Sequence, residues 1–352
     1  MQSHGGISRY FCEIASRLPG LGCDVQVIAP LHSNRHLHES QGVDLIGAYV
    51  PPIRFTAATR RALNRMLSSI MLKRRAGNGI LHQTYYQTDT RVRPGKRIVT
   101  VYDMIHERFP EDFKSRDSTP VNKPIAVARA DHVICISEST RKDLIDMFGV
   151  PREKTSVIYL ASDFEQATLS VQARTGRPYL AYVGLRGGYK NFIKLLEAYA
   201  GSRELNTTLD LVCFGGRAFT PAEQKAISAA GLQECVRQLS GNDQELKQYY
   251  ANAELFVYPS LYEGFGIPPL EAMTMGCPVA CANTSSLPEV VGDAAELFDP
   301  HDVGSLAAAL HRALDRERRR ELIERGYARV KEFSWDRCAR ETLKVYEMVS
   351  YT

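Results

Sequence analysis

The chain has 352 residues, of which 44% are hydrophobic and 24% are charged. This composition excludes a disordered or fibrous protein, and the length is sufficient for two domains of ordinary size. The formal net charge is only +4, and the basic excess lies in residues 1–165. A basic first half favours an anionic partner, either a phosphorylated substrate or a membrane surface. Nucleic acid is not an expected partner, because it would require a stronger and more clustered positive charge.

The eight cysteines are scattered through apolar runs without a Cys-x-x-Cys pair, which is typical of buried free thiols in a reducing compartment. The sequence shows no secretory leader and no apolar stretch of transmembrane length. We therefore expect a cytoplasmic protein, peripheral at most at the inner face of the membrane.

The chain opens with a Gly5-Gly6 turn and a helical pattern in which Tyr10, Phe11 and Ile14 share one face. A glycine turn that enters a helix normally follows a strand in a nucleotide-binding α/β unit. No such strand precedes it here, so we expect the first strand of the N-terminal domain to be missing, with Met1 marking an internal start or a truncated form.

Residues 24–30 are the next predicted strand, and His32, His36 and His38 follow it. Their spacing could suit a metal ion, but no cysteine or acidic ligand pattern accompanies them. We interpret this stretch as a solvated loop and predict no metal site.

Residues 57–75 are the most basic segment, with apolar residues at helical spacing among arginines and lysines. One interpretation is a surface helix packed on its own domain. The other is an amphipathic helix that contacts anionic lipid or receives a lipid-linked acceptor.

Predicted strands at 79–86 and 97–104 both end in polar residues, at the edge where open α/β sheets bind ligands. His82 and Asp103 are therefore site candidates, although a structural histidine explains His82 equally well. Strands at 132–137 and 155–160, separated by a helix at 138–148, complete the first half, and residues 162–178 are a predicted linker.

The second half repeats the alternation, with strands at 179–184, 209–215, 236–241, 254–260 and 278–282, which predicts a parallel sheet covered by helices. The turn after the first of these strands contains Gly184, Arg186, Lys190 and Asn191. Its glycines free the backbone and its cations precede a helix, an arrangement that suits a phosphate. It lacks the Walker pattern, so a P-loop ATPase is disfavoured, and an exposed basic turn is the alternative.

A second turn, from Glu263 to Glu271, joins an apolar strand to a helix that starts near Pro268. Gly264 and Gly266 let a ligand approach the backbone, and the first helical N–H groups point outward as an anion site. The two carboxylates could accept hydrogen bonds from sugar or ribose hydroxyls at opposite ends of one ligand. A helix with acidic residues in its first turn is the simpler alternative.

The Glu263–Glu271 stretch, with Gly-Phe-Gly after the first glutamate and Pro-Leu-Glu-Ala-Met at the second, resembles the signature of the family-4 retaining glycosyltransferases. Further segments resemble the family in the same order: the Gly-Gly-Ile-Ser-Arg opening, residues 134–139, Arg186 to Asn191, residues 276–295 and the Ser-Trp before the last helix. The resemblance covers nearly the whole chain and is closer to bacterial transferases of surface polysaccharides, which often use GDP-mannose.

The resemblance implies an α/β fold of the GT-B type, in which two Rossmann-like domains face across a cleft. Residues 1–165 would form the acceptor-binding domain, residues 166–335 the nucleotide-sugar-binding domain, and residues 336–352 a helix that crosses back to the first domain.

The family also implies roles for individual residues. Arg186 and Lys190 would bind the donor diphosphate, Glu271 the ribose, and Glu263 the transferred sugar, so that Glu263, Arg186 and Lys190 are the catalytic candidates. The donor-binding candidates are Gly184, Arg186, Lys190, Asn191, Gly264, Phe265, Gly266, Ile267 and Glu271. The candidates on the acceptor or sugar side are Gly5, Gly6, Arg9, His82, Asp103 and His106.

The resemblance implies a nucleotide-diphosphate sugar as co-substrate, a saccharide or lipid-linked acceptor, and no cofactor. Without an Asp-x-Asp motif, no divalent metal is expected. One departure is Tyr102, which stands before Asp103 where many members carry a histidine, so the parts played by Asp103 and His106 and the choice of sugar stay open. The alternatives are a nucleotide-sugar-binding protein without transfer activity and a GT-B epimerase or hydrolase.

Overall fold

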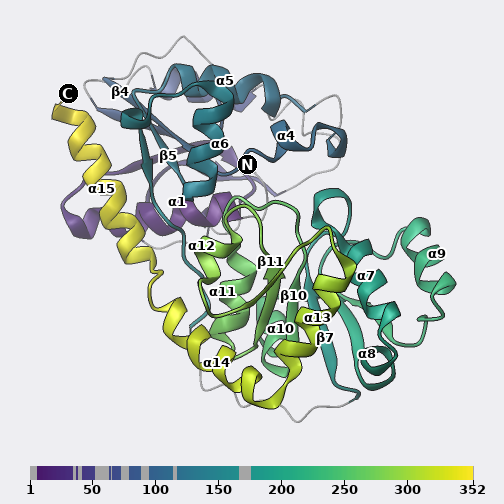
Figure 1. Ribbon diagram of the computed structural model, residues 1–352. Coiled ribbons are helices and arrows are strands. Elements are labelled where there is room, and N and C mark those ends of the chain that lie inside the picture. The colour runs from purple at the N-terminus through teal and green to yellow at the C-terminus, as the bar shows by residue number, and fades with distance from the viewer. Residues whose placement is uncertain are drawn as a thin grey trace. The chain divides into compact units, whose positions relative to one another are not determined.

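The computed structural model describes residues 6–34, 37–38, 42–51, 63–64, 66–72, 79–88, 95–113, 117–165 and 176–351. The chain divides into two compact units (Figure 1). Unit 1 comprises Met1–Glu107, Lys114–Leu160 and Ser334–Thr352, and unit 2 comprises Arg108–Phe113 and Ala161–Phe333. Gly5 and most of the basic segment at 57–75 lie outside the described residues.

Unit 1 contains two parallel sheets. The first pairs β1 (Gln26–His32) with β2 (Asp44–Tyr49), and the second has the order β3 (Ile80–Gln83), β4 (Lys96–Val101), β5 (His132–Cys135) and β6 (Thr155–Val157). Its helices are α1 (Gly6–Arg17), α5 (Thr119–Ala128), α6 (Glu138–Phe148) and α15 (Trp335–Tyr351), with α4 (Ile105–Arg108) at its boundary and short 3-10 turns at η1 (Leu18–Leu21) and η3 (Arg152–Lys154).

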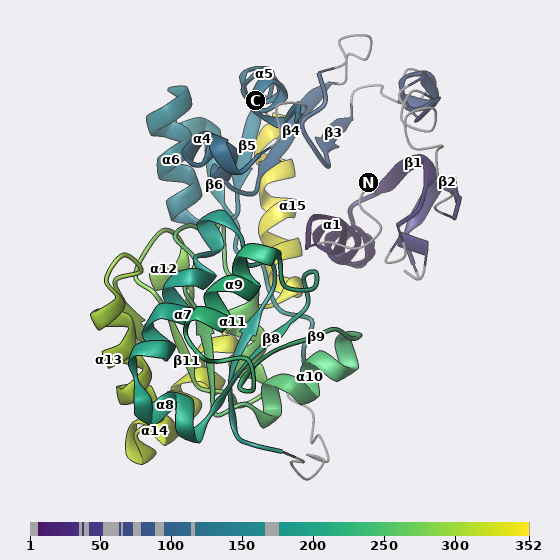
Figure 2. The same ribbon diagram turned by 90° about the vertical axis from the view of Figure 1, so that its right-hand side faces the viewer.

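Helix α15 packs against α1, and the two are neighbours in both views (Figures 1 and 2). Tyr10 on α1 is fully buried, and its ring lies 6.4 Å from the Trp335 ring of α15. At the surface, Arg17 Nε donates to Asp336 Oδ1 over 2.8 Å. The last helix therefore joins the first unit, as the fold class predicted.

Unit 2 is a single six-stranded parallel sheet with the order β12-β11-β10-β7-β8-β9. These strands are β7 (Tyr179–Val183), β8 (Asp210–Phe214), β9 (Val236–Leu239), β10 (Leu255–Tyr258), β11 (Val279–Ala282) and β12 (Glu296–Phe298). The helices are α7 (Phe192–Gly201), α8 (Arg203–Thr208), α9 (Pro221–Ala229), α10 (Asp243–Asn252), α11 (Ile267–Thr274), α12 (Leu287–Val291), α13 (Val303–Leu314) and α14 (Arg316–Val330), with η2 (Pro110–Asp112) and η4 (Gly188–Lys190) as 3-10 turns.

The chain order of the strands reverses at the middle of this sheet. From β7 the chain proceeds to β8 and β9 on one side, and then returns to place β10, β11 and β12 on the other. Open α/β sheets bind ligands at such a reversal, outside the carboxyl ends of the strands. The fold therefore directs attention to the turns that follow β7 and β10.

The sequence missed two strands, β2 and β12. Gly47 makes β2 look like a turn, yet a Cβ there would lie 1.9 Å from the Ala29 carbonyl oxygen, so the neighbouring strand requires a glycine. β12 has only three residues, too few to form a pattern. None of the helices in the described ranges is long and apolar enough to cross a membrane.

Two expectations need correction. His32 was expected in a solvated loop, but it is the buried last residue of β1, and its ring lies 5.8 Å from the Tyr49 ring. His38 is exposed, as expected, and its ring stacks 4.4 Å from the Tyr49 ring, while His36 is outside the described residues. All eight cysteines are thiols outside disulfides, as expected, but Cys23 is only partly buried.

Candidate functional site

The turns after β7 and β10 meet at the centre of the unit 2 sheet, because these two strands are neighbours. The Leu261 amide donates to the Tyr189 carbonyl over 2.7 Å, which ties the two turns together. Asn191 adds a second connection, since its side-chain amide donates to the carbonyls of Pro259 (3.1 Å) and Pro300 (2.8 Å). The predicted donor residue Asn191 thus holds the site together.

The central contact of the site joins Lys190 and Glu263. Lys190 Nζ donates to Glu263 Oε1 over 2.6 Å, and the two side chains are only 17% and 11% exposed. The ammonium also lies 5.7 Å from the centre of the Tyr258 ring at the end of β10. Burial, and then the negative charge of Glu263, raise the pKa of Tyr258 well above its ordinary value, so this phenol stays protonated.

The loop after β11 supports the backbone around Glu263. The Glu263 amide donates to Ser285 Oγ over 2.9 Å. Ser286 Oγ donates to the carbonyls of Glu263 and Phe265, each over 2.8 Å. Because these three hydrogen bonds hold the turn, the carboxylate projects from a fixed backbone.

Gly266 is the residue before α11 and has φ of 110°, a left-handed conformation that favours glycine. A Cβ at this position would also lie 2.8 Å from the Leu287 side chain. Ile267 is the first residue of the helix, and the amides at its start point away from the helix, as an anion site requires.

Glu271 is buried in α11 and accepts a hydrogen bond from the Tyr250 hydroxyl over 3.2 Å. Burial, followed by the charge of Glu271, raises the pKa of Tyr250 well above its ordinary value. The protonated phenol therefore orients one carboxylate oxygen.

Of the three catalytic candidates, Arg186 has the least exposed side chain. Its side chain is 4% exposed, Nε donates to Glu223 Oε1 over 2.9 Å, and Nη2 contacts the Arg217 carbonyl. The guanidinium also lies 4.7 Å from the Phe219 ring centre. Nη1 is buried without a hydrogen-bond partner in the described part of the chain. Most of the donors of Arg186 therefore hold the loop that leads into α9, and Nη1 is the nitrogen left for a ligand.

Gly184, the remaining donor candidate, directly follows β7 with φ of 116°, and its amide donates to the Phe214 carbonyl over 3.0 Å. Gly216, in the turn after β8, approaches it closely, because a Cβ on Gly216 would lie 2.9 Å from the Gly184 carbonyl oxygen. This second glycine turn was not among the predicted site elements, although a Gly215-Gly216 pair directly after a strand is a signal for it.

The site candidates in unit 1 lie on different elements and do not form one cluster of contacts in the described residues. His82 is partly buried, with Nδ1 2.7 Å from the Tyr346 hydroxyl and Nε2 2.8 Å from Thr100 Oγ1. Burial lowers its pKa to about 3, so the ring is neutral. Gly6 and Arg9 both lie on α1.

Asp103 and His106 lie near each other at the carboxyl end of β4. Asp103 Oδ1 accepts from the Ile105 amide over 3.1 Å, and His106 Nε2 lies 3.1 Å from Asp117 Oδ2. Beside them is a charged pair that the sequence did not predict: the fully buried Lys123 donates to Glu107 Oε2 over 2.7 Å and to the Asp103 carbonyl over 3.0 Å. Tyr102 is buried and donates to the Thr84 carbonyl over 3.3 Å.

No cluster of three or more histidine, cysteine, aspartate or glutamate side chains suitable for a metal ion occurs among the described residues. The groups of unit 2 that could bind a ligand are instead a lysine, two carboxylates, backbone amides and one arginine nitrogen. Such a set can bind an anion next to a polyhydroxylated group.

Comparisons with known proteins agree with this chemistry. Residues 4–166 match the family described as "Glycosyltransferase Family 4", and residues 163–329 match "Glycosyl transferases group 1". The O-antigen chain mannosyltransferase B of Escherichia coli is 34% identical over 230 residues, which are 62% of this chain and 60% of that protein. The MMP alpha-(1->4)-mannosyltransferase of Mycolicibacterium hassiacum is 35% identical over 230 residues, or 61% and 53% of the two chains. The matches thus span between half and two thirds of these relatives.

Among solved structures, the HepE protein of Anabaena in complex with UDP and glucose superposes with a TM-score of 0.75 at 18% identity, over 99% of this chain and 97% of that one. At this identity the likeness concerns the fold, and it confirms the predicted GT-B architecture.

Proposed function

The chain belongs to the family-4 glycosyltransferases, and we propose that it transfers a hexose, mannose or a related sugar, from a nucleotide-diphosphate donor to a saccharide or lipid-linked acceptor with retention of the anomeric configuration. The observation that carries this proposal is the Lys190–Glu263 contact at the reversal point of the unit 2 sheet. A cation and a carboxylate 2.6 Å apart suit a ligand whose phosphate and sugar are directly joined.

In the proposed reaction an acceptor hydroxyl oxygen bonds to the anomeric carbon of the donor while the bond from that carbon to the phosphate oxygen breaks. The bonding pair leaves with the diphosphate, and the acceptor proton passes to a phosphate oxygen. Both events occur on one face of the sugar, which accounts for retention.

The protein residues would act on the charge that develops on the departing diphosphate. Lys190, Nη1 of Arg186 and the amides of Phe265, Gly266 and Ile267 are the proposed donors. When the donor sugar binds, Lys190 would turn toward the phosphate, leaving Glu263 to accept hydrogen bonds from sugar hydroxyls. Glu271, oriented by Tyr250, would bind the ribose.

We assign the acceptor to unit 1, with Arg9, Asp103 and His106 as the candidates that reach it. His82 has both ring nitrogens occupied by Tyr346 and Thr100, so we assign it a structural role instead. Polysaccharide or O-antigen assembly is the proposed setting, and GDP-mannose the first donor to test, because several similar proteins are named mannosyltransferases.

Cations and amides of the chain suffice for charge stabilisation in this scheme, so we propose that no divalent metal is needed. The testing experiment incubates the purified protein with GDP-mannose, with and without a mannose-containing acceptor, in the presence and absence of a chelator. The proposal predicts acceptor-dependent release of GDP and a glycosylated product, both unchanged by the chelator.

Other results identify the alternatives. Binding of the donor without turnover would indicate a nucleotide-sugar-binding protein, and release of sugar equal with and without acceptor would indicate a hydrolase. Activity that is lost in chelator and restored by magnesium or manganese would contradict the metal-independent mechanism.

A further inference from the structure

Phe333 directly precedes the Ser-Trp segment before the last helix, and the proposed mechanism gives it no role. Its ring lies 5.7 Å from the Phe265 ring at an interplanar angle of 80°, which is a favourable edge-to-face contact. Phe265 is 3% exposed and belongs to the donor turn, by which we mean residues 263–266 between β10 and α11. The last residue of unit 2 therefore packs on the turn that carries Glu263.

Arg329, near the end of α14, holds helix α12. Its Nε donates to the Val290 carbonyl over 2.8 Å and its Nη2 to the Glu289 carbonyl over 2.5 Å, so the guanidinium caps the carboxyl end of α12. Nη1 donates to Glu332 Oε2 over 2.6 Å, and the guanidinium lies 5.1 Å from the centre of the Phe333 ring. All three nitrogens of this arginine are thus engaged by protein groups.

Helix α12 in turn holds the donor turn. The Oγ of its N-cap residue, Ser286, lies 2.8 Å from the carbonyl oxygens of both Glu263 and Phe265. Its first residue, Leu287, occupies the space beside Gly266, where a Cβ would lie 2.8 Å from the leucine side chain. Because α12 has only five residues, the guanidinium at its carboxyl end and the hydroxyl at its start fix one short element.

One face of α14 carries all of these contacts. A Cβ at Gly326 would lie 3.1 Å from Met273 Cγ, so the glycine lets α14 approach α11, the helix that follows the donor turn. Gly326, Arg329 and Phe333 stand at positions i, i+3 and i+7, the spacing of a single helical face. The chain keeps turning beyond α14, since the Phe333 amide donates to the Val330 carbonyl over 3.2 Å. This face therefore supports α11, α12 and the donor turn together.

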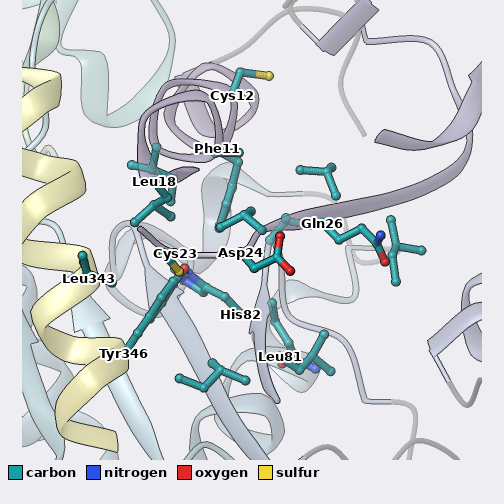
Figure 3. A pocket seen from close by; sticks show the side chains of 18 of the residues that line it. Phe11, Cys12, Leu18, Cys23, Asp24, Gln26, Leu81, His82, Leu343 and Tyr346 are labelled. Carbon is teal, nitrogen blue, oxygen red and sulfur yellow. The ribbon is translucent and has the colours of Figure 1, made fainter. Parts of the chain in front are cut away.

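The chain leaves unit 2 directly after Phe333, and the next helix, α15, is anchored in unit 1. Trp335 at its start is 6% exposed. Farther along the helix, Tyr346 projects toward His82, whose Nδ1 lies 2.7 Å from the tyrosine hydroxyl oxygen (Figure 3). Residues 331–334 are therefore a short connection, and the side chains at its two ends each pack within their own unit.

We propose that Arg329 and Phe333 are positioning residues of the donor site. They act on no substrate directly, and they hold the donor turn, through Phe265 and α12, in the conformation that binds the nucleotide diphosphate. This inference rests on the proposed function, in which the amides of residues 265–267 contact the donor. By linkage, a ligand that fixes the turn also fixes the connection at 331–334.

Four variants of the full chain test this proposal. Arg329→Met removes the guanidinium and keeps a long side chain, and Phe333→Leu removes the ring and keeps an apolar group. Phe333→Tyr keeps the ring and is the conservative rescue. Arg319→Met is the matched control, because Arg319 also lies on α14 and also donates to a carbonyl, that of Glu254. Glu254 directly precedes β10, at the end of the strand away from the donor turn.

Two measurements separate positioning from folding. Calorimetry with GDP and with UDP gives the nucleotide affinity. Hydrogen exchange without ligand gives the opening of residues 263–267, where the Glu263 amide is protected by its hydrogen bond to Ser285 Oγ. The amides of β7 report on unit 2 as a whole, and those of α15 are the reference in unit 1.

We expect Arg329→Met and Phe333→Leu to weaken nucleotide affinity by about 3- to 30-fold. Both should speed exchange at residues 263–267 by about ten-fold, while β7 exchanges as in the wild type. Phe333→Tyr and Arg319→Met should keep the wild-type affinity and exchange. In the wild type, GDP or UDP should slow exchange at residues 331–334 and leave α15 unchanged.

Wild-type affinity, or wild-type exchange at residues 263–267, in Arg329→Met and Phe333→Leu would overturn the proposal. Equal acceleration in β7, or an equal loss of affinity in Arg319→Met, would also overturn it, because the effect would then be a general loss of stability. A wild-type chain that binds neither nucleotide would contradict the proposed function. Faster exchange of the turn in the two variants would in that case still support the positioning role, and unchanged exchange would overturn it.

Discussion

Lys190 and Glu263 are 73 positions apart in the sequence, and each belongs to a glycine-rich turn whose local pattern is visible without a structure. Their mutual contact is not visible, because it depends on β7 and β10 being neighbours. Tyr250, Tyr258, Ser285 and Ser286 could not be predicted either. Each supports a glutamate through one hydroxyl group, and hydroxyl residues are too common in sequences to mark such a role.

Removal of the Lys190 ammonium should weaken donor binding. Lys190→Ala loses a charge-assisted contact of about 1.5–3 kcal/mol, which corresponds to roughly 10- to 150-fold in affinity for a nucleoside diphosphate. Calorimetry measures this directly. Lys194→Ala is the matched control, since Lys194 is an exposed lysine that pairs with Glu197 on the same helix. Equal affinities of the two variants would remove Lys190 from the phosphate site.

Substitutions of the two glutamates should have different effects on turnover and on donor affinity. Glu263→Gln should lower turnover with little change in nucleoside diphosphate affinity, because Glu263 is assigned to the sugar. Glu271→Gln should weaken that affinity, because Glu271 is assigned to the ribose. Steady-state kinetics and calorimetry of both variants give the comparison, and an exchange of these two phenotypes would reverse the assignments.

At the scale of elements, the contact between α15 and β3 within unit 1 includes a partly buried titratable group, His82. The pKa of His82 is lowered from 6.5 to about 3 by burial, while the ring bonds Tyr346 on α15. In the unfolded chain this histidine takes up a proton as the pH falls below about 6.5, whereas in the folded chain it does not. The contribution of His82 to the free energy of unfolding is therefore fully present above pH 6.5 and is lost progressively between pH 6.5 and 3.

Urea unfolding at pH 7.5 and pH 5 should show this effect. The wild-type free energy of unfolding should fall by up to about 1.4 kcal/mol for each pH unit below 6.5 through this residue alone. His82→Gln should be less stable at pH 7.5 but should lose less stability on acidification, and His301→Gln, at an exposed position, should behave like the wild type. Identical pH slopes for His82→Gln and the wild type would contradict the burial of a neutral ring.

The helical residues at 63–64 and 66–72 expose apolar side chains, as the membrane hypothesis for the basic segment requires. Leu63, Met66 and Ile70 are 39%, 49% and 42% exposed. The Asn64 side chain anchors this segment to Leu31 through two hydrogen bonds of 2.7 and 2.6 Å. Exposed apolar residues beside a basic sequence are typical of a helix that binds anionic lipid.

Sedimentation with vesicles tests this surface. The Met66→Ser, Ile70→Ser double variant should bind vesicles containing phosphatidylglycerol several-fold less than the wild type, through the loss of buried apolar area. Met147→Ser, at another exposed apolar position, should bind like the wild type. Unchanged binding by the double variant, or equal binding to neutral vesicles, would favour an ordinary surface helix.

At the scale of the whole molecule, the βα alternation predicted two α/β halves, and the structure has two units of parallel sheets. The order of the strands within each sheet could not be predicted from the sequence, because it depends on which strands pair. The division of the described strands of unit 1 into two sheets could not be predicted for the same reason.

The central claim is that this chain moves a sugar from a nucleotide diphosphate with retention, and the anomeric configuration of the product tests it most directly. Transfer from GDP-mannose, an α-linked donor, should give a product whose new linkage is also α. NMR of the isolated product reads this from the one-bond carbon–hydrogen coupling at the anomeric position. A β-linked product, or a glycosyl adduct trapped on Glu263, would contradict the account.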